Sequence, residues 1–391
     1  MKIHWVSIVI LLGPVMIWGF LIIGFFIWLV IPGLNFPQSL VISGCITATD
    51  PVLCAAVVGK GKFASKLPEH IRNILSAESA SNDGMALPFV YLGLNLVLKT
   101  GQNNEIAKDF ICISILYECI LGCLIGIFIG YSARHSVLYV SKKKLIDKES
   151  FIALYIFLSI VCAGIGSMIG CDDLLMSFAA GCAFSWNGWF IDATEPIHIV
   201  GIVDLILNLI YFLYFGAIIP WNQFNDPEIG TDIWRLIVIS LVVLILRRLP
   251  IILALKSSIP AIKTWKEALF CGHFGPVGVA AIFAAITARS NLEGNIVQTS
   301  TPLKSLPSKD SQNYQLMASI WPIATFNVLA SIIVHGSSVT LMMLFKYLKE
   351  QKFKTKDLPT SVSSIESIQL PHLSNSTDNS KEKKTENILE H

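Results

Sequence analysis

The stretch "LVISGCITATDPVLCAAVV", residues 40–58, is long and apolar enough to cross a bilayer, yet polar residues stand at its centre. Pro51 lacks a backbone N–H and disfavours helix at Asp50 before it. The side chains of Thr47, Thr49 and Asp50 can bond nearby backbone groups in place of the helical ladder. The sequence therefore predicts a membrane helix that is interrupted near its middle.

A second stretch, "EALFCGHFGPVGVAAIFAAI" at residues 267–286, has the same character, with helix-breaking residues beside His273. These residues are Gly272, Gly275, Pro276 and Gly278. Non-helical backbone at membrane depth is tolerated only where protein or water covers it. One interrupted segment in each half of the chain indicates a secondary transporter built from inverted repeats. Two ordinary proline-kinked helices are the alternative, because Pro and Gly are common in membrane helices.

The composition favours the bilayer as solvent. The chain has 391 residues, of which 53% are hydrophobic and 14% charged, whereas a soluble domain carries roughly a quarter charged residues. The net charge of +2 is too small to indicate nucleic-acid binding.

About ten segments have the roughly 17–25 apolar residues that a spanning helix needs. They are 6–30, 39–58, 73–98, 110–132, 151–170, 173–190, 197–220, 233–255, 267–288 and 318–346.

Loop charges predict the orientation of these segments. Lys and Arg gather in loops 59–72, 133–150 and 256–266, which should face the cytoplasm, whereas loop 221–232 holds acids and no Lys or Arg. A chain with ten spans places every one of these loops on its expected side and both termini in the cytoplasm. Residues 1–346 are therefore predicted to form a membrane domain. The polar segment 347–391 is predicted to be a disordered cytoplasmic tail.

The stretch "LSAESASNDGMALPF", residues 75–89, places two acids within a predicted span. A charge at the bilayer centre costs roughly 2.5–3.5 kcal/mol on insertion scales, so such residues are read as functional. On a helix, Glu78 and Asn82 share one face, and Asp83 lies on the adjacent face. Arg247 and Arg248 interrupt a later apolar stretch; either one neutralises Glu78, or both mark the cytoplasmic boundary.

Other polar residues have structural readings of equal or greater weight. Asp172 and Asp173 stand at a turn between two spans, at an outer mouth or as a helix cap. Glu118, Asp204 and His335 are read as packing residues. The nine cysteines show no metal-site spacing and are read as small buried hydrophobes. No cofactor is expected.

Five stretches together resemble the fungal plasma-membrane alkali-metal cation/proton antiporters of the cation/proton antiporter superfamily. They are 31–89, 172–190 ("DDLLMSFAAGCAFSWNGWF"), 247–255 ("RRLPIILAL"), 262–285 and 331–338 ("SIIVHGSS"). The resemblance implies an all-α polytopic membrane protein with the inverted-repeat fold of sodium/proton antiporters. Its core bundle would carry two crossed, discontinuous helices, and a second bundle would form a homodimer interface.

The resemblance also implies roles for single residues. Asn82 and Asp83 would lie at the ion site, and Thr49, Asp50 and Pro51 at the helix crossing. Glu78 would form a structural ion pair with Arg248 or, less favoured, Arg247. Asp172, Asp173 and His273 match positions tied to transport, and Asp147 matches more loosely. Two departures stand out: the chain begins where the family has passed about three helices, and Asn187 replaces an acid that relatives usually carry.

The resulting hypothesis is competition between a proton and Na⁺, Li⁺ or K⁺ at Asp83. Carboxylate and carbonyl oxygens suit hard cations, and Asn82, Thr49 and the unwound backbone near Asp50 could supply further oxygens. Asp50 would balance the partial positive charge of helix N-termini. His273 either helps to sense pH or packs against the broken backbone.

Two other functions are alternatives to cation/proton exchange. An intramembrane aspartyl protease also uses two acids, but the chain lacks a Gly-x-Gly-Asp sequence. A transport-inactive truncated product, or a subunit that pairs with a full-length antiporter, is the other. The choice between Na⁺ and K⁺ stays open.

Overall fold

The structure is a computed structural model that describes residues 4–50, 67–143, 145, 148–188, 199–297, 300–303 and 305–356. The chain divides into two units, Met1–Met343 and Leu344–His391. Most of the predicted tail, 347–391, lies outside the described residues, so this boundary stays a prediction. Within the described ranges the regular elements are helices, apart from one isolated β-bridge between Asp226 and Thr231.

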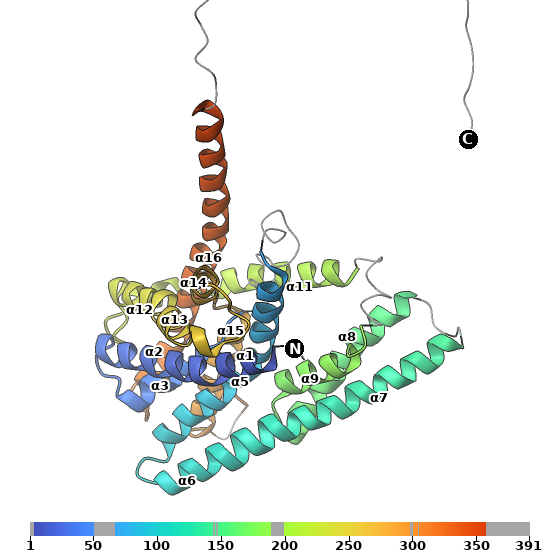
Figure 1. Cartoon of the computed structure of the whole chain (residues 1–391). Coiled ribbons are helices and arrows are strands. Elements are labelled where there is room, and N and C mark those ends of the chain that lie inside the picture. Colours follow the sequence, from blue (N-terminus) through green and yellow to red (C-terminus); the bar gives the residue numbers. More distant parts are fainter. Residues whose placement is uncertain are drawn as a thin grey trace, which may run out of the picture. The chain divides into compact units, whose positions relative to one another are not determined.

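The described part of every predicted span contains helical structure (Figure 1); residues 51–58, 189–190 and 197–198 of these spans lie outside the described residues. The first half comprises α1 (Trp5–Ile10), η1 (Leu11–Val15), α2 (Met16–Val30), α3 (Phe36–Cys45), α5 (Glu69–Leu98), α6 (Asn103–Lys108), η3 (Asp109–Leu121), α7 (Gly122–Lys142) and α8 (Lys148–Ile169). The second comprises α9 (Asp173–Phe184), α11 (Ile199–Ile218), η5 (Trp221–Asn225), α12 (Ile233–Ile245), α13 (Leu249–Ala254), η6 (Lys256–Ser258), α14 (Trp265–His273), α15 (Val279–Gly294) and α16 (Tyr314–Lys356).

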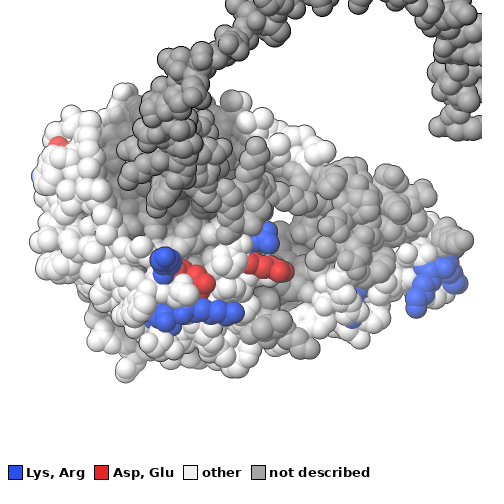
Figure 2. All heavy atoms as spheres, turned by 45° about the horizontal axis from the view of Figure 1, so that its top comes forward, with Lys and Arg blue, Asp and Glu red and all other residues white. Residues whose placement is uncertain are grey.

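Four stretches among the described residues are both long and apolar enough to cross a membrane. They are Trp5–Val30, Asn103–Lys142, Ile233–Ala254 and Tyr314–Ser338. Shorter apolar stretches among the described residues are Ala153–Ile169, Asp173–Phe184 and Leu205–Ile218. The helices α14 and α15 are pieces of an interrupted span, and α5 carries the acids. On the face that Figure 2 shows, most of the described atoms belong to uncharged residues, and the acidic and basic atoms lie in a few groups.

The second predicted interruption is present, and in the first span the helix ends at Cys45, within the described residues. α3 begins with a capping box between Asn35 and Gln38 and ends at Cys45, before Asp50. α14 begins with a capping box between Thr264 and Glu267 and ends at His273, and residues 274–278 separate it from α15. The caps satisfy the free N–H groups where these helices begin. Pro51 lies outside the described residues.

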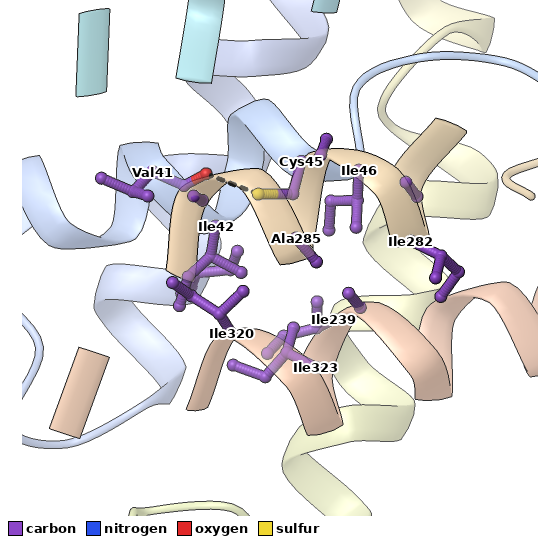
Figure 3. Close-up of a cluster of buried hydrophobic side chains, with 14 of the residues drawn as sticks. Val41, Ile42, Cys45, Ile46, Ile239, Ile282, Ala285, Ile320 and Ile323 are labelled. Carbon is purple, nitrogen blue, oxygen red and sulfur yellow. Dashed lines mark hydrogen bonds between the residues drawn. The ribbon is translucent and has the colours of Figure 1, made fainter. Parts of the chain in front are cut away.

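The core lies where pieces of α3, α12, α15 and α16 meet. Figure 3 shows side chains from these four helices in contact, among them Ile42, Ile239, Ala285 and Ile323. Beside them, α3 and α5 approach closely at Gly44, where an added Cβ would lie 2.9 Å from the backbone nitrogen of Val90. Small residues allow such close backbone contact between membrane helices. The site helix α5 is thereby held against the interrupted span.

Candidate functional site

Asp50 lies in the chain segment that follows α3, against the second interruption. Its backbone N–H donates a hydrogen bond to the carbonyl of Pro276 at 2.7 Å, and the residue is 1% exposed. Gly278 precedes the first residue of α15, and a Cβ there would overlap the carboxylate of Asp50. The carboxylate thus lies at the N-terminus of α15, where the helix dipole is positive. This position agrees with the helix crossing at which the family resemblance places Asp50.

Asn82 joins α5 to the segment after α3. Its Oδ1 accepts from the backbone N–H of Thr49 at 3.0 Å, and its Nδ2 donates to Thr49 Oγ1 at 2.7 Å. Thr49 Oγ1 in turn donates to Ser79 Oγ at 3.2 Å. All three side chains are buried. Among the described residues, Asn82 Oδ1 and Thr49 Oγ1 each accept one hydrogen bond, which leaves one lone pair on each oxygen for a further ligand.

Asp83 follows Asn82 on α5 and presents an oxygen without a partner. Its Oδ1 is buried and has no hydrogen-bond donor among the residues that the structure describes. Asp50 is near enough to act on Asp83 electrostatically. An ionised carboxylate can only accept hydrogen bonds, and a buried one without donors is costly. Binding a proton or a cation would remove that cost.

Glu78 and Arg248 form a buried ion pair. Glu78 is 1% exposed and Arg248 5%. Arg248 Nη1 donates to Glu78 Oε1, and Nη2 donates to Oε2 at 2.9 Å. Two parallel bonds of this kind are the strong form of an arginine–carboxylate contact. Glu78 is therefore neutralised one turn before Asn82 and Asp83.

Arg247 does not pair with Glu78, so this alternative is wrong, and so is the reading that both arginines mark the membrane boundary. Arg247 is 2% exposed. Its Nη1 donates to the carbonyls of Ile46, Thr47 and Ala48 at 3.1, 3.3 and 3.0 Å, and its Nη2 donates to the carbonyl of Gly275. These carbonyls follow the C-termini of α3 and α14, where helix dipoles are negative. Arg247 thus complements Asp50 at the crossing.

The other predicted residues lie around this cluster. Asp172 is 5% exposed and caps α9 by accepting from the N–H of Leu175. It also lies against α5, because a Cβ at Gly84 would be 3.2 Å from its Oδ1. Asp173 is the first residue of α9 and packs on Gly166 of α8. His273 points instead toward α16, with Nε2 3.2 Å from Ser338 Oγ. Asp147 lies outside the described residues.

His335 is more closely integrated than its packing reading implies. It is 1% exposed, and its Nε2 lies 3.1 Å from the carbonyl of His273 at the end of α14. Its Nδ1 lies 3.1 Å from Ser331 Oγ, and Ser331 accepts from the N–H of Val277. The spacing of Ser331 and His335 on one helix face was the available signal. Sequence reasoning also missed Ser79, which is one turn from Asn82.

No group of three or more His, Cys, Asp and Glu residues in the described part of the chain is arranged to hold a metal ion.

Residues 1–345 match the family model "Sodium/hydrogen exchanger, transmembrane". The chain belongs to this sodium/hydrogen exchanger family.

Several curated members of the exchanger family are similar to this chain. Na(+)/H(+) antiporter 2 of Zygosaccharomyces rouxii is 53% identical over 345 residues, which are 88% of this chain and 43% of that protein. The Na(+)/H(+) antiporter of Saccharomyces cerevisiae is 57% identical over 88% of this chain and 35% of its own length. One from Schizosaccharomyces pombe is 43% identical over 88% of this chain and 72% of its own length. The chain thus spans less than half the length of the first two relatives.

A solved structure shows the same fold. The sodium proton antiporter MjNhaP1 from Methanocaldococcus jannaschii superposes with a TM-score of 0.63 over 88% of this chain and 79% of its own, at 18% sequence identity. The all-α fold with interrupted helices, which the sequence predicted, is therefore that of a sodium/proton antiporter. The relatives carry the names of transporters, which agrees with a non-enzymatic role.

Proposed function

We propose that this chain exchanges alkali-metal cations for protons across a membrane, with Asp83 as the carboxylate that binds each in turn. The observation that carries the proposal is the buried Oδ1 of Asp83, which has no donor among the described residues although Asn82, the residue before it, bonds to Thr49 at the helix crossing. Na⁺, Li⁺ and K⁺ are the candidate cations. The names of the fungal relatives support Na⁺ and H⁺ as the exchanged pair.

The proposed ligands follow from the hydrogen bonds. The free lone pairs of Asn82 Oδ1 and Thr49 Oγ1 supplement the carboxylate of Asp83. The carbonyls of residues 46–48 are poor candidates, because they already accept from Arg247. Ion and proton would compete at Asp83, and movement of the core bundle against the second bundle would expose the site alternately to either side.

We also propose a membrane location, a topology and an assembly for this protein. The protein would be a multi-pass plasma-membrane protein with both termini in the cytoplasm, because the basic loops then lie inside. Residues 1–346 would form the antiporter domain, with 347–391 as a cytoplasmic tail. A homodimer is the proposed assembly, and neither a cofactor nor nucleic acid takes part.

Transport by purified protein in vesicles tests the proposal. A pH-sensitive dye inside acid-loaded vesicles should report rapid alkalinisation when Na⁺ is added outside. Asp83→Asn should abolish this response while the protein still inserts. Asp310→Asn, a change of an exposed acid far along the chain, should leave it intact. A Na⁺-driven response of wild-type size from Asp83→Asn would refute the assignment.

A further inference from the structure

A large apolar cavity lies between α5 and the packed helices α7 and α9. Its volume is about 730 Å³, within the range of small-molecule sites. Ser81 and Met85 of α5 line one wall, and Cys123 and Ile127 of α7 line another. The remaining lining is mostly apolar, and Arg134 is the one charged residue in it. An apolar cavity with a single cation at its edge selects an amphiphilic ligand.

Arg134 is a buried cation without a carboxylate partner among the described residues. It is 8% exposed. Its Nη1 donates only to the neutral Oδ1 of Asn187 at 3.3 Å, its Cζ lies 5.0 Å from the ring centroid of Tyr131, and its Nε has no hydrogen-bond partner. A buried charge is costly unless it is paired. The cavity therefore offers a strong site for an anion.

The depth of the cavity matches one half of a bilayer. From Cys123 to Arg134, α7 rises by about 16 Å at ~1.5 Å per residue, and half of a hydrocarbon core is about 15 Å thick. Tyr131 and Trp186 both line the cavity and are more than half exposed, as aromatic residues at a membrane–water interface are. The basic end of α7 places Arg134 on the cytoplasmic side.

We propose that this cavity binds one acyl chain of an anionic phospholipid from the cytoplasmic leaflet, with the lipid phosphate against Arg134. Basic pockets between membrane helices on the cytoplasmic side bind anionic headgroups in this way. The chain would extend along α7 toward Cys123. Because the ligand would lie between the site helix α5 and the α7–α9 pair, it would stabilise the conformation that contains the cavity. Anionic lipid would then determine how readily α5 separates from the α7–α9 pair.

Lipid retention by the full chain tests this proposal. The protein is reconstituted in vesicles that contain equal amounts of phosphatidylcholine and phosphatidylserine. It is then extracted, and the mass of the intact protein with its bound lipids is measured by native mass spectrometry. Wild type should retain phosphatidylserine over phosphatidylcholine by at least about fivefold, the ratio expected for one cation near the headgroups. Asn187→Asp has the same shape and supplies an internal anion beside Arg134, so the preference should fall toward one.

Two further variants complete the test. Lys142→Gln removes an exposed cation from the same helix and should leave the preference unchanged. Cys123→Trp fills the cavity and should release the retained lipid. A melting temperature close to that of wild type would show that this variant is folded. An unchanged preference in Asn187→Asp, an equal loss in Lys142→Gln, or retention of free fatty acid in place of phospholipid would overturn the proposal. The readout is independent of whether Asp83 carries ions.

Discussion

Asn82 and Thr49 hold each other through two hydrogen bonds that use both ends of the Asn82 amide. One residue belongs to the continuous helix α5, and the other to the backbone that follows α3. The residue expected to help bind the ion is thus also the link between the site helix and the helix crossing. Movement of either element must carry the other along, which keeps Asp83 beside Asp50.

Thr49→Val should destabilise the protein by about 1–3 kcal/mol, because it leaves Asn82 Nδ2 buried without an acceptor. Thr49→Ser keeps the hydroxyl and should cost less. Thr47→Val is the matched control, since Thr47 Oγ1 donates only to the carbonyl of Ser43 on α3. Thermal unfolding of the purified variants gives the comparison. Equal losses from both valine variants would show that the Asn82 link does not matter.

Arg248→Gln should lower stability by about 3–5 kcal/mol, because it leaves Glu78 charged and unpaired in a buried place. Adding Glu78→Gln should recover a large part of the loss. A double-mutant cycle from unfolding in denaturant measures the coupling. If the double variant is no more stable than Arg248→Gln alone, the pair does not account for the effect.

Arg247→Lys should loosen the crossing although the charge is kept. A lysine ammonium has three donors and no planar fork, so it cannot bond the carbonyls of residues 46–48 and Gly275 together. Faster amide hydrogen exchange in the segments around residues 46–50 and 275–278 is the expected result. Arg235→Lys serves as control, since Arg235 forms a local pair with Asp232. Unchanged exchange at both segments would argue against this role.

Gly278→Ala should reduce transport and stability together, because the added Cβ would overlap the carboxylate of Asp50. Gly294→Ala lies at the other end of α15, where an added Cβ meets nothing within 4 Å. That control should be neutral or slightly stabilising in the unfolding assay. Equal behaviour of the two variants would mean that Asp50 does not need this close approach.

His335→Phe should weaken the attachment of α16 to the end of α14, because the carbonyl of His273 loses the donor at 3.1 Å. His335→Gln can restore one donor and should be milder. The melting temperatures of the two variants measure the difference. Ser337→Ala, which changes an exposed residue of the same helix, is the control. A phenylalanine variant as stable as the glutamine variant would contradict this role.

The sequence alone was enough for the helical class, the position of both interruptions and the residues around Asp83. These features depend on local chemistry: long apolar runs cross a bilayer, Pro and Gly interrupt helices, and an acid in a span calls for a function. The place of Asp50 at a helix crossing was implied by the family resemblance, while local signals indicated only that its span is interrupted. All ten predicted segments contain helical structure in their described parts, while residues 51–58, 189–190 and 197–198 of these segments, and Asp147, lie outside the described residues.

Only the tertiary structure decided which partner each charge takes. Arg247 and Arg248 are neighbours in the chain and chemically identical, yet one binds Glu78 and the other binds carbonyls of two separate segments. Arg134 meets Asn187 only because α7 packs on α9. Such choices depend on helix rotation and on close approach at residues such as Gly44 and Gly278. The sequence therefore determines which groups the membrane must satisfy, while packing between distant helices determines which groups satisfy them.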